Sequence, residues 1–154
     1  MRALVQRVSE GGVYIADHNY KAEIGKGLVI LLGIKSDDKS EDVIFVADKC
    51  SNLRIFEDDN GKMNLSLKDI DGDVLIISQF TLYGDAQKGN RPSFTEAARP
   101  EIAIPLYESF INRMKMNLGN EKVKCGIFGA MMQVKILNDG PVTILIESKS
   151  QANN

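Results

Sequence analysis

Two mainly apolar segments constrain the fold of this chain more than any other feature of its sequence. The first is Gly27–Ile34 (GLVILLGI) and the second is Asp73–Phe80 (DVLIISQF). Runs this short, bounded by glycine or charge, predict strands that are buried on both faces. Both fall far short of the roughly 20 apolar residues that a membrane-spanning helix needs, so no association with a membrane is expected.

Two other segments have the spacing of amphipathic helices. A helix beginning at Ser40 would place Cys50 on its apolar face, where we interpret the cysteine as a small buried residue rather than a nucleophile. The start of the second helix is left open, because Pro100 and Pro105 precede or interrupt it and an interior proline breaks the hydrogen-bond ladder. The apolar positions are Val43, Val46, Ala47, Cys50 and Leu53 in the first segment, and Leu106, Phe110, Ile111 and Met114 in the second.

Shorter strand-like segments flank these elements. They are Ala3–Val8, Gly12–Ile15, Lys21–Ile24, Ala130–Leu137 and Val142–Glu147. We expect a turn near Gly11-Gly12 between the first two, and another at Asn138-Asp139-Gly140-Pro141 between the last two. The order of elements predicts a single α/β domain over residues 1–148, with a mixed sheet, two helices on one face and further strands on the other (three layers, α/β/β). Residues 149–154 are expected to form a polar C-terminal tail.

Composition excludes several kinds of chemistry. The 154 residues include 19 basic and 21 acidic side chains, one histidine and two cysteines. Cys50 and Cys125 form neither a disulfide framework nor a zinc-ligand spacing, so we expect a reduced, cytoplasmic protein without metal or cofactor. His18 lies in a polar turn, and any Ser-His or Cys-His system would have to use it. Chemistry by imidazole is therefore not expected.

Three local features depart from these regular patterns. The strand ending in Ser78-Gln79-Phe80-Thr81 finishes in polar groups, which are typical of substrate binding where a strand opens into a loop, although they could equally satisfy backbone groups. In Asn138–Pro141, proline directly after glycine leaves open a plain turn or an unusual backbone, including a cis bond. Arg7 shares a face with apolar residues, so it either extends to the edge or is anchored by carbonyls or a carboxylate.

A fourth feature is the loop Lys88–Phe94, which combines glycine, Lys88, Arg91 and an aromatic ring. Such a segment could bind phosphate, or its cations could be ordinary surface charges. The net charge of −2 argues against a general coat on polyanions but allows a local basic patch.

Taken together, these segments resemble the D-aminoacyl-tRNA deacylase family of the bacterial and eukaryotic type. The patterns SQxxL and NxGPxT, in this order and in a chain of this length, are specific to it. The resemblance rests on Met1–Val8, Gly25–Leu28, Ser78–Gly84, Arg91–Phe94, Phe128–Met132 and Asn138–Thr143.

The resemblance implies a homodimeric editing enzyme that hydrolyses the ester between a D-amino acid, or glycine, and the 3′ end of tRNA. It implies that the Gly140-Pro141 bond is cis and that each subunit inserts this pair into the active site of its partner, where the carbonyls exclude L side chains. Arg7 would hold those carbonyls, and Ser78, Gln79 and Phe80 would line the pocket. Lys88 and Arg91 are the first candidates for contact with tRNA.

Thr81 matches a threonine considered as a nucleophile in this family, but a hydroxyl needs a base and no histidine is expected nearby. Our hypothesis is instead that amides near Phe80 stabilise the oxyanion and that the 2′-hydroxyl of the substrate positions or activates water. Two alternatives stay open. One is a related deacylase with a trans Gly-Pro bond that acts on L-aminoacyl-tRNA, which carries proline where this chain has Ser78. The other is a non-catalytic, tRNA-binding dimer.

Overall fold

The sheet is organised around one long strand, β1 (Arg2–Ile15), in a computed structural model that describes residues 1–148. The expected turn near Gly11-Gly12 is wrong, because β1 runs straight through both glycines. A Cβ atom on Gly11 would lie 2.8 Å from Val29 Cγ2, so this glycine allows close packing against a neighbouring strand rather than a reversal of the chain.

The strand order is β2-β1-β3-β6-β7, with β8 on the other edge of β1. The two apolar runs lie side by side as the parallel pair β3 and β6, and they are buried as predicted. β1 is antiparallel to β3, so the sheet is mixed. The bounds are β2 Tyr20–Ile24, β3 Gly27–Gly33, β6 Asp73–Ser78, β7 Val123–Cys125 and β8 Gln133–Glu147.

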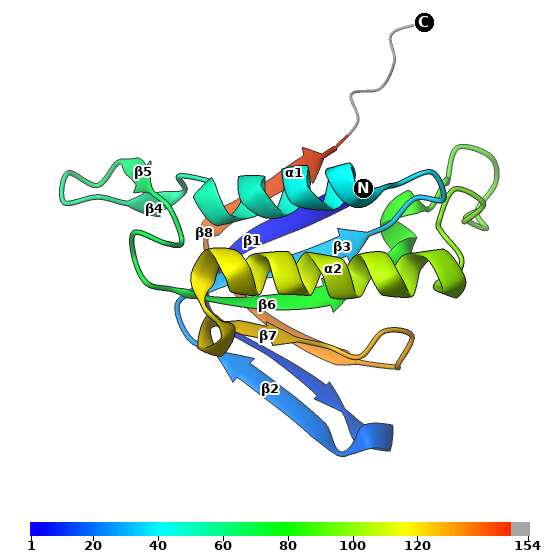
Figure 1. Cartoon of the computed structure of the whole chain (residues 1–154), viewed down its shortest axis with the longest axis horizontal. Helices are drawn as coiled ribbons and strands as arrows, with labels where there is room; N and C mark the ends of the chain where they lie inside the picture. The colour runs from blue at the N-terminus through cyan, green and yellow to red at the C-terminus, as the bar shows by residue number, and fades with distance from the viewer. Residues whose placement is uncertain (149–154) are drawn as a thin grey trace, which may run out of the picture.

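Both helices, α1 (Ser40–Asn52) and α2 (Pro100–Leu118), cover the same face of this sheet (Figure 1). Their predicted apolar stripes pack there against β1, β3 and β6, and Cys50 is fully buried. α2 begins at Pro100, in the first turn where proline is tolerated, and Pro105 lies inside the helix on its exposed side. In residues 1–148, neither helix is long and apolar enough to cross a bilayer.

The second face of the sheet is covered by strands. The C-terminal half of β1, together with β2 and the N-terminal half of β8, encloses a second apolar cluster against β3 and β6. Its buried members are Val8, Val13, Ile15, Ile24, Val29, Leu75 and Ile77. The predicted three-layer α/β/β arrangement is therefore confirmed.

Small elements connect the layers. They are the hairpin of β4 (Phe56–Glu57) and β5 (Met63–Leu65), and the 3₁₀ turns η1 (Ala16–His18), η2 (Phe80–Tyr83) and η3 (Asn120–Lys122). The run Asp73–Phe80 thus ends as a strand at Ser78, two residues earlier than its apolar pattern indicated. The predicted tail, residues 149–154, lies outside the described residues.

β8 is one strand, where the sequence predicted two strands around a turn. Both halves of β8 pair with β1 in the same antiparallel direction, so the chain does not reverse at Asn138–Pro141. Gln6 pairs with Thr143 but Val8 pairs with Asn138, and the extra residues of β8 between these pairs form a bulge. The turn-forming residues therefore push a short loop out of a continuous strand.

Candidate active site

A cleft of about 430 Å³ lies beside the last residues of β6 and the first residue of η2. Figure 1 shows the end of the sheet to which the arrow of β6 points. One wall is the end of β6 and the start of η2, and the other is the segment between β7 and β8. Ser78 and Gln79 are half-buried in it, whereas Phe80 is 56% exposed. The lining residues are Ile77, Ser78, Gln79, Phe80, Phe128, Gly129, Ala130, Met131, Met132 and Val134.

The chain leaves the sheet in a defined way at this cleft. The amide of Gln79 donates to the carbonyl of Leu32 over 2.8 Å, which is the last bond between β6 and β3, and η2 follows directly. The side-chain amide of Gln79 donates to the hydroxyl of Thr81. Because the first N–H groups of any helical turn lack acceptors within it, we expect the amide of Phe80, which lines the cleft, and that of Thr81, the next residue, to be open to a ligand.

Among the residues that line this cleft, none has an ionisable side chain. His18 lies in η1, exposed, and does not line the cleft. Cys125 precedes the second wall, but burial raises the pKa of its thiol and keeps it protonated at neutral pH. The polar groups available for chemistry in this cleft are therefore the Ser78 hydroxyl, the Gln79 carboxamide and backbone groups.

The loop Lys88–Phe94 lies next to the cleft. It is closed at its base by paired backbone hydrogen bonds between Asp85 and Ser93, at 2.7 and 2.8 Å. Phe94 then packs edge-on against Phe80, with ring centroids 5.2 Å apart. Lys88 and Arg91 project from this loop and are exposed.

Arg7 is anchored rather than extended to the edge of the sheet. Its side chain is almost fully buried, and its Nε donates to the carbonyl of Asp139 over 2.8 Å while Nη1 donates to the carbonyl of Ile55 over 2.7 Å. Both acceptors are carbonyls, and the carboxylate of Asp139 lies farther away, at 3.9 Å. Of the two interpretations left open by the sequence, anchoring is correct.

Arg7 thereby holds the bulge that carries Gly140 and Pro141, whose connecting peptide bond is cis. Gly140 has a φ of +142°, in the region that disfavours L side chains. Asn138 braces the same bulge, because its Oδ1 accepts from the amide of Val142 at 2.8 Å and its Nδ2 donates to the Thr143 hydroxyl at 3.1 Å.

Within one chain, this bulge and the cleft are separate. In the register of the sheet, Arg7 on β1 is level with Leu28 on β3, and Leu28 is level with Val74 near the start of β6. The cleft lies at Ser78, at the opposite end of β6. Neither Gly140 nor Pro141 lines the cleft. The structure thus brings Ser78, Gln79 and Phe80 together in one place, and the bulge with Arg7 in another.

The second wall of the cleft, Phe128–Met132, was not predicted as part of the site. Its local signals are weak: Gly129 has a φ of +77° and Met131 is 86% exposed, and neither property can be read from sequence. The bracing role of Asn138 was also missed, because it depends on a bulge rather than on the expected turn.

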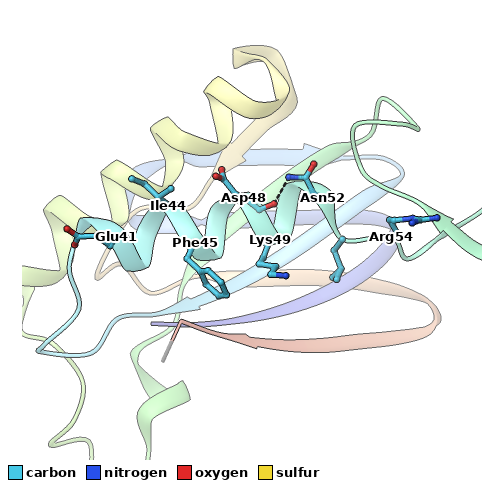
Figure 2. Close-up of a pocket in the computed structure, with 8 residues that line it drawn as sticks. Glu41, Ile44, Phe45, Asp48, Lys49, Asn52 and Arg54 are labelled. Atoms are coloured by element: carbon cyan, nitrogen blue, oxygen red, sulfur yellow. Dashed lines mark hydrogen bonds between the residues drawn. The ribbon is translucent and has the colours of Figure 1, made fainter. Parts of the chain in front are cut away.

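A larger cavity, of about 690 Å³, runs along the outer side of α1 and contains none of the predicted site residues. Figure 2 shows two of its apolar members, Ile44 and Phe45, on the same helix as Asp48 and Lys49. It shares no lining residue with the cleft at the end of β6.

Comparison with known proteins places this geometry in a family. The model of the D-Tyr-tRNA(Tyr) deacylase family matches residues 4–147. The chain belongs to this family. The prediction made from the sequence is therefore confirmed.

Curated members of the deacylase family are similar over almost their whole length. A D-aminoacyl-tRNA deacylase of Flavobacterium psychrophilum is 53% identical over 98% of this chain and 99% of its own. The D-aminoacyl-tRNA deacylase of Cytophaga hutchinsonii is 56% identical, again over 98% of this chain and 99% of its own. One of Thermosipho africanus is 54% identical over 97% of this chain and 98% of its own.

Solved structures share the fold. The c-Myc DNA Unwinding Element Binding Protein superimposes with a TM-score of 0.91 at 41% identity, covering 97% of this chain and all of that one (100%). A probable eukaryotic D-amino acid tRNA deacylase has a TM-score of 0.82 at 18% identity, covering 95% of this chain and 98% of that one, which supports the fold alone.

Proposed function

We propose that this chain hydrolyses the ester bond of D-aminoacyl-tRNA, and of glycine mischarged on tRNA, and so acts as a chiral proofreading enzyme. The observation that carries the proposal is the cleft at Ser78–Phe80, which borders the first residue of η2 and has no ionisable side chain among its lining residues, in a member of the deacylase family. An aminoacyl ester is already reactive. Stabilisation of the oxyanion by about 3–4 kcal/mol from an oriented donor would accelerate its hydrolysis by two to three orders of magnitude.

In this mechanism the ester carbonyl oxygen accepts hydrogen bonds from the amides at the start of η2, Phe80 first. The oxygen of a water molecule attacks the carbonyl carbon, and the bond from that carbon to the ribose 3′-oxygen breaks. One proton of the water passes to the 3′-oxygen and the other is released to solvent, which leaves a free carboxylate and the tRNA 3′-hydroxyl. We assign the task of positioning or activating water to the neighbouring 2′-hydroxyl, because none of the cleft residues supplies a base.

Thr81 has no place as a nucleophile in this scheme. Its hydroxyl accepts a hydrogen bond from Gln79, and a threonine hydroxyl becomes nucleophilic only beside a group that takes its proton. We assign Ser78 and Gln79 to binding the terminal adenosine and the ester, since both are half-buried in the wall of the cleft.

The chiral filter in this proposal is the bulge at Gly140-Pro141. The hydrogen bond from Arg7 goes to the carbonyl of Asp139, one residue before the pair, and so fixes the bulge from that side. The carbonyls of Gly140 and Pro141 would then clash with an L side chain, whatever kind of D side chain the substrate carries. Such a filter predicts broad tolerance of D-amino acids.

This filter must come from a second copy of the chain, because the bulge does not line the cleft of its own subunit. In a two-fold symmetric dimer, one contact made twice would complete both clefts. Leu137 and Leu145 of β8 are about half exposed on either side of the bulge, at 50% and 52%, and would be covered by the partner.

Contact with tRNA is assigned to the loop beside the cleft. Lys88 and Arg91 are exposed in the loop that ends at Phe94, the residue packed on Phe80, and we assign them to phosphates near the 3′ end. The proposed location is the cytoplasm, where tRNA is charged.

The test is deacylation of tRNAs charged with chemically different D-amino acids, such as D-tyrosine and D-aspartate, together with glycine and the matching L forms. The proposal predicts hydrolysis of all D forms and of glycine, with L forms left at the uncatalysed rate. Selective hydrolysis of L forms would favour the related L-acting deacylase, and tight tRNA binding without hydrolysis would favour a non-catalytic dimer. Either result would contradict the proposal.

The role of the 2′-hydroxyl is tested with tRNA that ends in 2′-deoxyadenosine. The mechanism predicts that hydrolysis of its D-aminoacyl ester falls by orders of magnitude. Hydrolysis at the full rate would exclude a role for the 2′-hydroxyl, but D-aminoacyl-tRNA would still be the proposed substrate.

A further inference from the structure

Arg2, at the start of β1, joins three elements that meet behind the cleft. Its Nη1 donates to the backbone carbonyl of Leu82 in η2 over 2.9 Å. Its Nε pairs with Glu147 at the end of β8 over 2.7 Å. Its guanidinium carbon also lies 4.6 Å from the ring centre of Tyr83. One side chain therefore contacts η2 at two consecutive residues.

The carbonyl that Arg2 binds belongs to the same short turn as the amides assigned to the oxyanion. The last carbonyls of a helical turn lack partners within it, as its first amides do. η2 has only 4 residues, so a group that fixes the carbonyl of Leu82 also fixes the direction of the amide of Phe80. Arg2 holds one end of the turn and the cleft lies at the other.

On the side that faces β3, the turn meets a residue without a side chain. Beneath it lies Gly33 of β3, the residue that pairs with Arg2 in the sheet. A Cβ atom there would be 3.1 Å from Leu82 Cβ and 3.2 Å from the Gln79 carbonyl oxygen. The glycine lets the turn approach the strand closely but contributes no side chain to hold it, and the neighbouring Arg2 supplies that contact.

We propose that Arg2 is a positioning residue for the hydrolysis: it does not line the cleft, and it acts by fixing η2 so that the amides of Phe80 and Thr81 point at the ester carbonyl. This inference rests on the function proposed above. Arginine suits the task because a planar guanidinium can donate in two directions and stack on a ring simultaneously, which a lysine ammonium cannot.

The experiment compares Arg2→Met and Arg2→Lys with the wild-type chain, using D-tyrosyl-tRNA. Arg2→Met should lower kcat at least about tenfold, because small displacements of catalytic groups are costly, with KM within about twofold. Arg2→Lys, which can still donate to Leu82, should recover part of the lost kcat. The ratio of D to L hydrolysis should stay unchanged, since Arg2 does not contact the bulge at Gly140.

The matched control is Glu147→Gln, which removes the ion pair but leaves the hydrogen bond from Arg2 to Leu82 and the stacking on Tyr83. Its kcat should stay within about twofold of wild type. Amide hydrogen exchange should accelerate at Leu82 and its neighbours in Arg2→Met and not in Glu147→Gln. If Arg2→Met does not fold, the comparison of Arg2→Lys with Glu147→Gln makes the same test.

Two results would overturn the inference. One is a wild-type kcat in Arg2→Met. The other is an equal loss of kcat in Arg2→Met and Glu147→Gln, which would mean that Arg2 acts by joining β1 to β8 rather than through η2. Failure of the proposed function itself would be recognised separately, because the wild-type chain would then not hydrolyse D-tyrosyl-tRNA in the same assay.

Discussion

Arg7 on β1 donates from Nε to the backbone carbonyl of Asp139 on β8, over 2.8 Å, and this bond connects residues 132 positions apart in the sequence. The same guanidinium binds the carbonyl of Ile55, and the side chain is 9% exposed. The bulge at Gly140-Pro141 is therefore held by a buried group of another strand, in addition to the local hydrogen bonds of Asn138.

Replacing Arg7 with methionine should affect both stability and selectivity. The variant leaves the carbonyls of Ile55 and Asp139 without their donor, which should lower the free energy of unfolding by about 2–4 kcal/mol. The released bulge should admit L side chains, so the ratio of D to L hydrolysis should fall. Urea unfolding and paired deacylation assays measure the two effects. A variant with wild-type stability and selectivity would contradict the role assigned to Arg7.

Gly140→Ala should also reduce selectivity. A Cβ atom would lie 2.7 Å from Val142 Cγ2 and 2.8 Å from Val142 N, at a φ of +142°, so the bulge must move. A backbone forced into this region costs about 1–3 kcal/mol. Gly61→Ala is the matched control, because Gly61 also has a positive φ, of +71°, but has nothing within 4 Å of the added atom. Gly61→Ala should keep the wild-type ratio of D to L hydrolysis, and an unchanged ratio in Gly140→Ala would remove this glycine from the filter.

Thr81→Ala should retain most of the hydrolytic activity. The hydroxyl accepts a hydrogen bond from Gln79 but has no base beside it, so its loss should change kcat by less than about tenfold. Single-turnover rates on D-tyrosyl-tRNA give the comparison. An inactive but folded Thr81→Ala would restore threonine as the nucleophile and displace the substrate-assisted mechanism.

The ion pair between Asp48 of α1 and Arg113 of α2 predicts a dependence of stability on pH. The hydrogen bond from Arg113 holds the pKa of the Asp48 carboxyl below its ordinary value. The pKa of this carboxyl is lower in the folded protein than in the unfolded chain, where it is about 3.9. Ionised Asp48 therefore stabilises the fold at any pH above the unfolded pKa. This stabilisation is lost as the pH falls through the folded pKa. Asp48→Asn should therefore cost more at pH 6 than at pH 3, measured by urea unfolding. An equal cost at both values would contradict this origin.

The sequence predicted the layers of the fold because they depend on local patterns. The continuous apolar run Gly27–Ile34 and the helical spacing of the two apolar stripes each predict burial, and both are buried where expected. The bulge in β8 was missed because Asn-Asp-Gly has the same local chemistry in a turn and in a bulge. The difference is made by β1, which pairs with both halves of β8 and prevents reversal.

The candidate site was predicted on one side only. Ser78, Gln79 and Phe80 follow an apolar strand, so their place at a strand end could be read from the chain. The facing wall, Phe128–Met132, has no such pattern and becomes a wall only when β7 pairs with β6. The anchoring of Arg7 likewise depends on carbonyls from distant segments of the chain, so it could not be predicted from the residues around Arg7.

Whether the enzyme is a chiral deacylase is decided by comparing D-tyrosyl-tRNA and L-tyrosyl-tRNA, prepared on the same tRNA, as substrates of the wild-type chain under single-turnover conditions. We expect rapid hydrolysis of the D ester, and hydrolysis of the L ester at the rate measured without protein. Equal hydrolysis of the two esters, or none of either, would rule out chiral proofreading by this chain.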